Sequence, residues 1–126
     1  MFGSTMIAVA LAEALVERFR PLLSPDMLVA NDADMVILRR DATQGWIGVG
    51  LDVSEKASDL ELERATYNAL RALQEFMCEQ LAHPWPTPNS HEPGVRVDER
   101  EIHLYFGDFD APALRLPSIS REALRS

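Results

Sequence analysis

The chain has 126 residues, of which 47% are hydrophobic and 25% are charged, and its formal net charge is −8. This length and composition are typical of a folded globular domain and exclude a disordered chain. We therefore expect one domain over residues 1–126. The acidic charge, without a cluster of basic residues, makes nucleic acid a poor partner and favours a protein partner with a basic patch.

The residues that report on compartment point to the cell interior. Cys78 is the only cysteine, so no internal disulfide is expected and nothing indicates an oxidising compartment. The apolar run from Met6 to Ala12 has no basic residue before it and is too short to span a bilayer. We expect a cytoplasmic protein with no membrane partner, or a virion protein made in the cytoplasm. Only one of the 12 basic residues is a lysine, Lys56, which indicates a GC-rich bacterial or phage genome.

The stretch from Met6 to Leu15 predicts a first helix, because its apolar residues recur at helical spacing until Pro21 ends the pattern. Only Glu13 is polar in this stretch, and a helix that is apolar nearly all round is buried on more than one side. It lies either between layers of its own domain or against a neighbouring subunit. In the second case Ile7 and Leu11 are candidate contact residues.

Three short β runs follow and predict a meander: Met27–Ala30, Met35–Arg40 and Trp46–Val53. In the third run alternate residues face the core, and the others form an outer stripe of Trp46, Gly48 and Gly50. Another protein chain could approach this stripe closely, because glycine leaves the backbone bare. The alternative is that the first helix or the C-terminal tail covers it, which is the more usual outcome for a sheet face.

A long amphipathic helix is predicted over about Ser58 to Ala82, with Glu61 as the partner of Ser58 in a capping box. The proline-rich run His83–Pro88 ends it, since proline biases the residue before it away from the helical region. Trp85 in this run has two interpretations. It is either a plug at the end of the core, which we favour, or a contact residue on a rigid turn.

The remaining pattern predicts a hairpin of Val95–Val97 and Glu101–Phe106, and then an extended tail from Gly107 to Ser126. The element order is therefore α-β-β-β-α-β-β with a tail. We expect an α+β fold in which two helices pack on one face of an antiparallel sheet.

No motif predicts catalysis, a metal or a cofactor. Cys78 with His83 could form a nucleophile and base, but the C-terminal end of a helix disfavours a thiolate, and an inert surface thiol is the better interpretation. Cys78, His83, His91 and His103 do not have the spacing of zinc ligands. Asp108 and Asp110 lack the other ligands of a calcium loop, so a solvated turn is expected there.

The run Leu73–Phe76, followed by Trp85–Pro93, resembles a group of small uncharacterised actinobacterial and actinophage proteins. In that group a helix leads into Trp-Pro and then into a turn rich in proline and histidine before a hairpin. Where some members carry cysteines around the turn, this chain has Thr87. The resemblance covers about Leu62 to Phe106 and implies no activity.

We expect a non-enzymatic protein that works by contact with other protein chains, through self-association or with a basic partner. A phage neck or tail-completion subunit is one form of this hypothesis. The alternative is an acidic chaperone or immunity-type inhibitor that caps a basic protein, since secretion-chaperone-like proteins share a similar element order. A third hypothesis is a small hydrolase that uses His91 or His103 with Asp108 or Asp110.

Overall fold

The computed structural model describes residues 5–41, 44–86 and 91–125. The first helix is fixed at its start by Thr5. Helix α1 spans Met6–Phe19, and the Thr5 hydroxyl accepts a hydrogen bond from the N–H of Ala8 at 3.1 Å. The same hydroxyl donates to the carbonyl of Val53 at 2.6 Å, which ties the helix start to a segment 48 residues later. A short 3₁₀ turn, η1 (Arg20–Leu22), follows the helix.

The predicted meander is confirmed. Strands β1 (Met27–Asp32), β2 (Met35–Arg40) and β3 (Gly45–Gly50) form an antiparallel sheet in chain order. The third strand ends at Gly50, three residues earlier than expected. Leu51 and Val53 are nevertheless buried in the core, so this segment keeps its inward side chains without strand pairing.

The long helix and its capping box are also confirmed. Helix α2 spans Asp59–Leu81, and Ser58 and Glu61 bond reciprocally, each backbone N–H donating to the other's side chain at 3.2 Å. The helix ends where Ala82 adopts a left-handed conformation with φ 58°. Its inner side is a buried stripe composed of Leu62, Thr66, Ala69, Leu70, Leu73, Gln74, Phe76 and Met77.

The C-terminal region forms more regular structure than the sequence indicates. Strands β4 (Pro93–Val97), β5 (Glu101–Gly107) and β6 (Pro112–Ser120) form a second antiparallel sheet, and a 3₁₀ turn, η2 (Ala123–Arg125), ends the described chain. The predicted tail is therefore extended over β6, but it pairs with β5 as a third strand of this sheet, which was not predicted. This strand lies at the edge of its sheet, where Pro117 is tolerated, and its register with β5 shifts twice.

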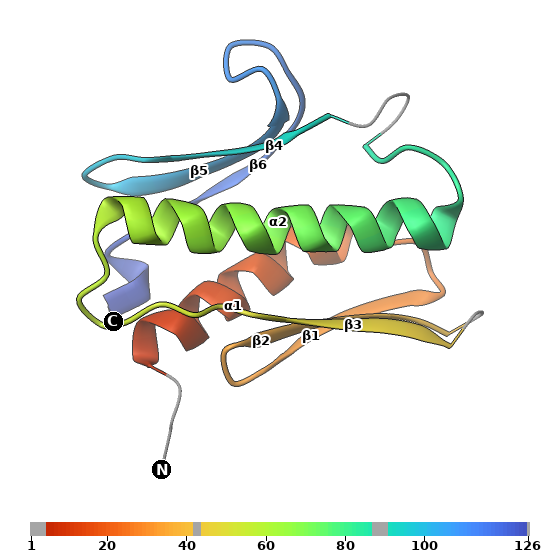
Figure 1. Ribbon diagram of the computed structural model, residues 1–126, viewed down its shortest axis with the longest axis horizontal. Helices are drawn as coiled ribbons and strands as arrows, with labels where there is room; N and C mark the ends of the chain where they lie inside the picture. Colours follow the sequence, from red (N-terminus) through yellow and green to blue (C-terminus); the bar gives the residue numbers. More distant parts are fainter. Residues whose placement is uncertain (1–4, 42–43, 87–90, 126) are drawn as a thin grey trace.

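The two helices lie between the two sheets (Figure 1). Helix α2 packs along β3 and β4, whereas α1 packs against β1 and β2 on one side and against β6 and η2 on the other. The α+β class is confirmed, but the expectation of a single sheet was wrong. The six strands form two three-stranded sheets, and no strand of one pairs with a strand of the other within the described residues.

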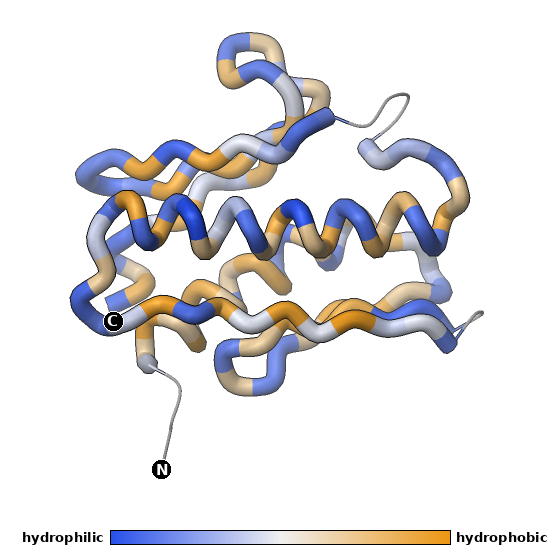
Figure 2. The backbone as a smooth tube through the Cα atoms, in the orientation of Figure 1, coloured by the Kyte–Doolittle hydropathy of each residue, from blue (hydrophilic) through white to orange (hydrophobic). Residues whose placement is uncertain are grey.

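This layering explains why α1 is apolar nearly all round. Figure 2 shows α1 in mostly hydrophobic colours, whereas hydrophilic and hydrophobic residues alternate along α2. Half of the α1 residues are buried because elements lie on two of its sides. The hydrophobic core draws side chains from both helices and both sheets.

Candidate protein-contact surface

The β1–β2–β3 sheet has one face toward the helices and one face away from them. Alternate residues of its three strands point away, and the antiparallel register sets them in three rows. We call these rows the outer face; they are Leu28–Arg39–Trp46, Ala30–Ile37–Gly48 and Asp32–Met35–Gly50.

Large apolar side chains are exposed on the outer face. Trp46 is 65% exposed, Leu28 is 50% exposed and Met35 is 39% exposed. They are three of the five large hydrophobic side chains that are exposed among the described residues; the other two, Met6 and Leu60, belong to the first turns of the helices. A group of exposed apolar side chains on one surface is typical of an interaction site, whereas single ones are ordinary. The alternative interpretation of the stripe required the first helix or the C-terminal tail to cover it. Neither α1 nor β6 covers Trp46.

The two glycines of the outer face shape it differently. A Cβ atom at Gly48 would lie 2.8 Å from the Met35 sulfur and 3.6 Å from Cζ3 of Trp46, so glycine lets both side chains lie close to the strand. A Cβ atom at Gly50 would have no neighbour within 4 Å. The outer face is therefore closely packed around Gly48 and open at Gly50.

Charged side chains lie toward both ends of the outer face. Arg39 lies in the first row and pairs with Asp41, with 3.1 Å between Nε and Oδ1, and both side chains are more than half exposed. Asp32 lies in the third row and is exposed. The middle row, with Ala30 and Ile37, carries no charge. The surface is thus apolar at its centre, with the Arg39–Asp41 ion pair toward one end and the Asp32 carboxylate at the other.

Three predicted contact residues are in the core instead. Ile7 is 3% exposed, Leu11 is fully buried and Trp85 is 8% exposed. The Trp85 ring packs against Phe19 and Phe106, at centroid distances of 5.9 and 5.2 Å. This corrects the prediction that Ile7 and Leu11 contact a partner, because their surfaces are already covered by the same chain. For Trp85 the burial agrees with the plug that we favoured and not with its alternative role as a contact residue.

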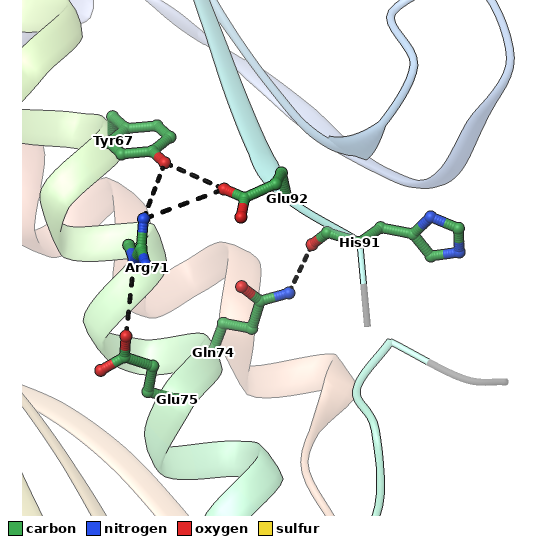
Figure 3. A network of polar contacts seen from close by, with 6 residues as sticks. All are labelled: Tyr67, Arg71, Gln74, Glu75, His91 and Glu92. Carbon is green, nitrogen blue, oxygen red and sulfur yellow. Dashed lines mark hydrogen bonds and ion pairs between the residues drawn. The ribbon is translucent and has the colours of Figure 1, made fainter. Parts of the chain in front are cut away.

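A polar network joins α2 to His91 and Glu92, just before β4 (Figure 3). The buried amide of Gln74 donates to the carbonyl oxygens of Trp85 and His91, at 3.1 and 2.5 Å. The Tyr67 hydroxyl donates to Glu92 at 3.0 Å. Residues 87–90, including Thr87 of the resemblance, lie outside the described part of the chain. The network fixes the backbone on both sides of them, and Figure 3 shows the His91 ring pointing away from α2.

The second sheet differs, because its own loop packs over its outer side. The Phe109 ring lies edge-on to Tyr105, with 5.4 Å between centroids, and the Arg96 guanidinium lies 3.9 Å from the Phe109 ring centroid. Arg115 donates to the Phe109 carbonyl and also faces its ring at 5.0 Å. Tyr105 is only 8% exposed as a result. This sheet therefore offers a partner less apolar surface than the outer face does.

Of the groups considered for the hydrolase hypothesis, His103 has a carboxylate partner other than Asp108 or Asp110. Nε2 of His103 lies 2.8 Å from Oδ2 of Asp98, a residue outside the predicted set. Hydrogen bonds to His103 and to the N–H groups of Arg100 and Glu101 lower the pKa of Asp98 to about 2. The Cys78 sulfur lies 3.6 Å from the carbonyl oxygen of Trp85.

No metal site is apparent in the part of the chain that the structure describes. Within it, no three His, Cys, Asp or Glu side chains are grouped closely enough to hold a metal ion. The residues weighed for zinc and calcium, among them His83 and Asp108, therefore form no such group.

The outer face includes residues that sequence reasoning missed. Leu28, Met35 and Ile37 were not among the candidates, although the stripe of Trp46, Gly48 and Gly50 was. The useful pattern was that β1 and β2 place apolar residues at adjacent positions, so both faces of each strand are apolar. An antiparallel sheet with one solvated face usually alternates instead.

Comparison with known proteins adds no family to this description. Neither the family models, the curated proteins nor the solved structures contain a match to the chain. Among the described helices, none has the length and apolar character needed to cross a membrane.

Proposed function

We propose that the chain is a non-enzymatic protein that binds another protein chain through the outer face of the β1–β2–β3 sheet. One observation carries the proposal: Trp46 is 65% exposed on a regular sheet, on the same face as the exposed side chains of Met35 and Leu28. Exposed tryptophan is enriched at protein contacts, because a rigid aromatic ring provides a large area at a low entropic cost. The bacterial or phage cytoplasm is the compartment in which we place it.

The proposed role is that of a subunit in a larger assembly, and a phage neck or tail-completion complex is the form that we favour. The sheet supports this role because its strands hold the contact residues in a fixed pattern before binding, which limits the entropy lost on association. The apolar sides of both helices already pack in the core, so the exposed apolar side chains of the outer face are what the proposal assigns to contact.

A second candidate function rests on the net charge of −8. A chaperone or immunity-type inhibitor that caps a basic protein would gain affinity and association rate from such a charge. The identity of the bound protein separates the two functions. A structural protein of a particle supports the assembly role, and a basic toxin or effector supports the capping role.

Site-specific cross-linking in the native cells tests the proposal. A photoreactive residue replaces Ala30, which is exposed in the middle row of the outer face, and a matched control replaces Arg96 on the other sheet. We expect cross-links to a protein chain from position 30 only, and their loss when Trp46→Ala is added. Equal cross-linking from both positions, or none from position 30, contradicts the proposal. Mass spectrometry of the adduct identifies the bound chain.

A further inference from the structure

We infer that the partner of the outer face is another copy of this chain, packed sheet against sheet about a two-fold axis. This inference rests on the proposed function, because it names the partner of the same surface. Sheets that pack face to face keep their strands roughly aligned, so the three rows determine which side chains meet. In a two-fold contact the same residues take part from both sides.

Charge selects between the two possible axes in the plane of the contact. An axis parallel to the strands sets each row against itself and places Arg39 opposite Arg39, so Arg39 keeps only the Asp41 of its own chain as a partner and gains no opposite charge. An axis perpendicular to the strands, through the middle row, sets the first row against the third. Arg39 of one copy then faces Met35 of the other copy. It also lies beside Asp32 of that other copy, because Asp32 is the cross-strand neighbour of Met35. Opposite charges meet at both ends of this second arrangement.

Shape favours the same axis. It places the exposed indole of Trp46 over Gly50 of the second copy, where even a Cβ atom would have no neighbour within 4 Å. Bare backbone at this position allows the ring to approach closely. Ile37, in the middle row of the central strand, meets its own copy on the axis. The least apolar contact, Leu28 with Asp32, lies on β1 at the rim, where water still reaches the carboxylate.

The size of the outer face sets the strength of the contact. Three strands about 4.8 Å apart, each with six residues at about 3.3 Å per residue, give a face of roughly 14 by 20 Å. A standard stable interface buries about 800 Å² on each partner, which is more than this face supplies. The inferred dimer is therefore weak, and its population depends on protein concentration in the micromolar range and above.

Two single substitutions and their mixture test this geometry in the purified full-length chain. Trp46→Ala removes the indole. Gly50→Val fills the position that receives the indole, and the open space there lets the monomer accept the new side chain. Each variant alone should dimerise at least tenfold more weakly than the unmodified chain. Leu60→Ala, an exposed leucine on α2, is the matched control and should dimerise normally.

The mixture of the two variants is the decisive measurement. A mixed pair keeps one native contact, in which Trp46 of the Gly50→Val chain lies over Gly50 of the Trp46→Ala chain. In its second contact, the small alanine at position 46 faces the added valine at position 50, and these two side chains fit together. Sedimentation equilibrium of the mixture should therefore recover the mass increase from 14.1 kDa toward twice that value, which neither variant shows alone. Circular dichroism of each variant confirms that it is folded.

The outcomes separate this inference from the proposed function. A chain that stays at 14.1 kDa up to millimolar concentration overturns the dimer, while cross-links from position 30 to a different protein keep the proposed function. A dimer that tolerates Gly50→Val, or a mixture that shows no recovery, overturns the pairing of Trp46 with Gly50. The absence of both a dimer and cross-links removes both proposals.

Discussion

Asp98 and His103 are joined across the β4–β5 turn by a contact of 2.8 Å between Oδ2 and Nε2. The other carboxylate oxygen of Asp98 accepts hydrogen bonds from the N–H groups of Arg100 and Glu101, at 2.8 and 2.7 Å. These contacts favour the ionised carboxylate, and they lower the pKa of Asp98 from 3.8 to about 2. One side chain thus fixes the turn that brings β4 and β5 into register.

Acid should weaken the fold through this carboxylate. A carboxyl whose pKa is lower in the folded chain than in the unfolded chain stabilises the fold above the unfolded value, and this contribution is lost as the pH falls. For Asp98 the loss lies between about pH 4 and pH 2. Urea unfolding at several pH values should show a smaller decline for Asp98→Asn than for the unmodified chain. Asp110→Asn is the control, and equal declines for Asp98→Asn and the unmodified chain contradict the prediction.

The two tryptophans should respond oppositely to truncation. Trp85→Ala leaves a cavity between Phe19 and Phe106 and should lower the free energy of unfolding by about 3–5 kcal/mol. Trp46→Ala removes an exposed ring and should change the free energy of unfolding by less than about 1 kcal/mol. Both values come from denaturant unfolding followed by circular dichroism, at concentrations where the chain is monomeric. A larger cost at position 46 than at position 85 would falsify this assignment.

Gln74 should matter for stability through its hydrogen bonds. Gln74→Met keeps the length of the side chain but removes both donors, so that the carbonyls of Trp85 and His91 lose a buried partner. We expect the free energy of unfolding to fall by about 1–3 kcal/mol. Glu79→Gln, on an exposed position of the same helix, provides the matched control. If both substitutions have the same small effect, Gln74 does not hold this segment.

Two glycines should differ when alanine replaces them. A Cβ atom at Gly94 would overlap the Tyr105 ring, which is itself buried, so Gly94→Ala should lower the free energy of unfolding by about 1–3 kcal/mol. At Gly50 the space is open, so Gly50→Ala should leave the free energy of unfolding unchanged or raise it by up to about 1 kcal/mol. Thermal and urea unfolding of the two variants measure the difference. A costly Gly50→Ala substitution contradicts the open position.

The sequence predicts the local elements well because their patterns are local. The capping box of Ser58 and Glu61 locates the start of α2, and the turn residues separate the strands of the first meander. Strand β6 was missed because Pro112, Pro117 and two register shifts break the alternation that marks a strand. The division into two sheets was missed because the alternation of apolar and polar residues along one strand does not indicate which other strand it pairs with.

The candidate surface was predicted in part. The stripe on β3 followed from alternation within one strand, whereas Leu28 and Met35 join it only through strand pairing. The inward position of Ile7 and Leu11 depends on which layers enclose α1, and this is a property of the whole fold. An apolar helix is compatible with burial inside a domain or between subunits until its neighbours are known.

The two meanders also determine how much chain must be ordered before contacts form. Every strand pair joins neighbours in the chain, so each sheet can form by closing loops of a few residues, which costs little entropy. Distant parts of the chain meet mainly where the helices contact the strands, as when α1 packs against β6. We therefore expect a chain with six strands to fold faster than β-rich proteins of the same length, with docking of the two preformed sheets onto the helices as its slow step.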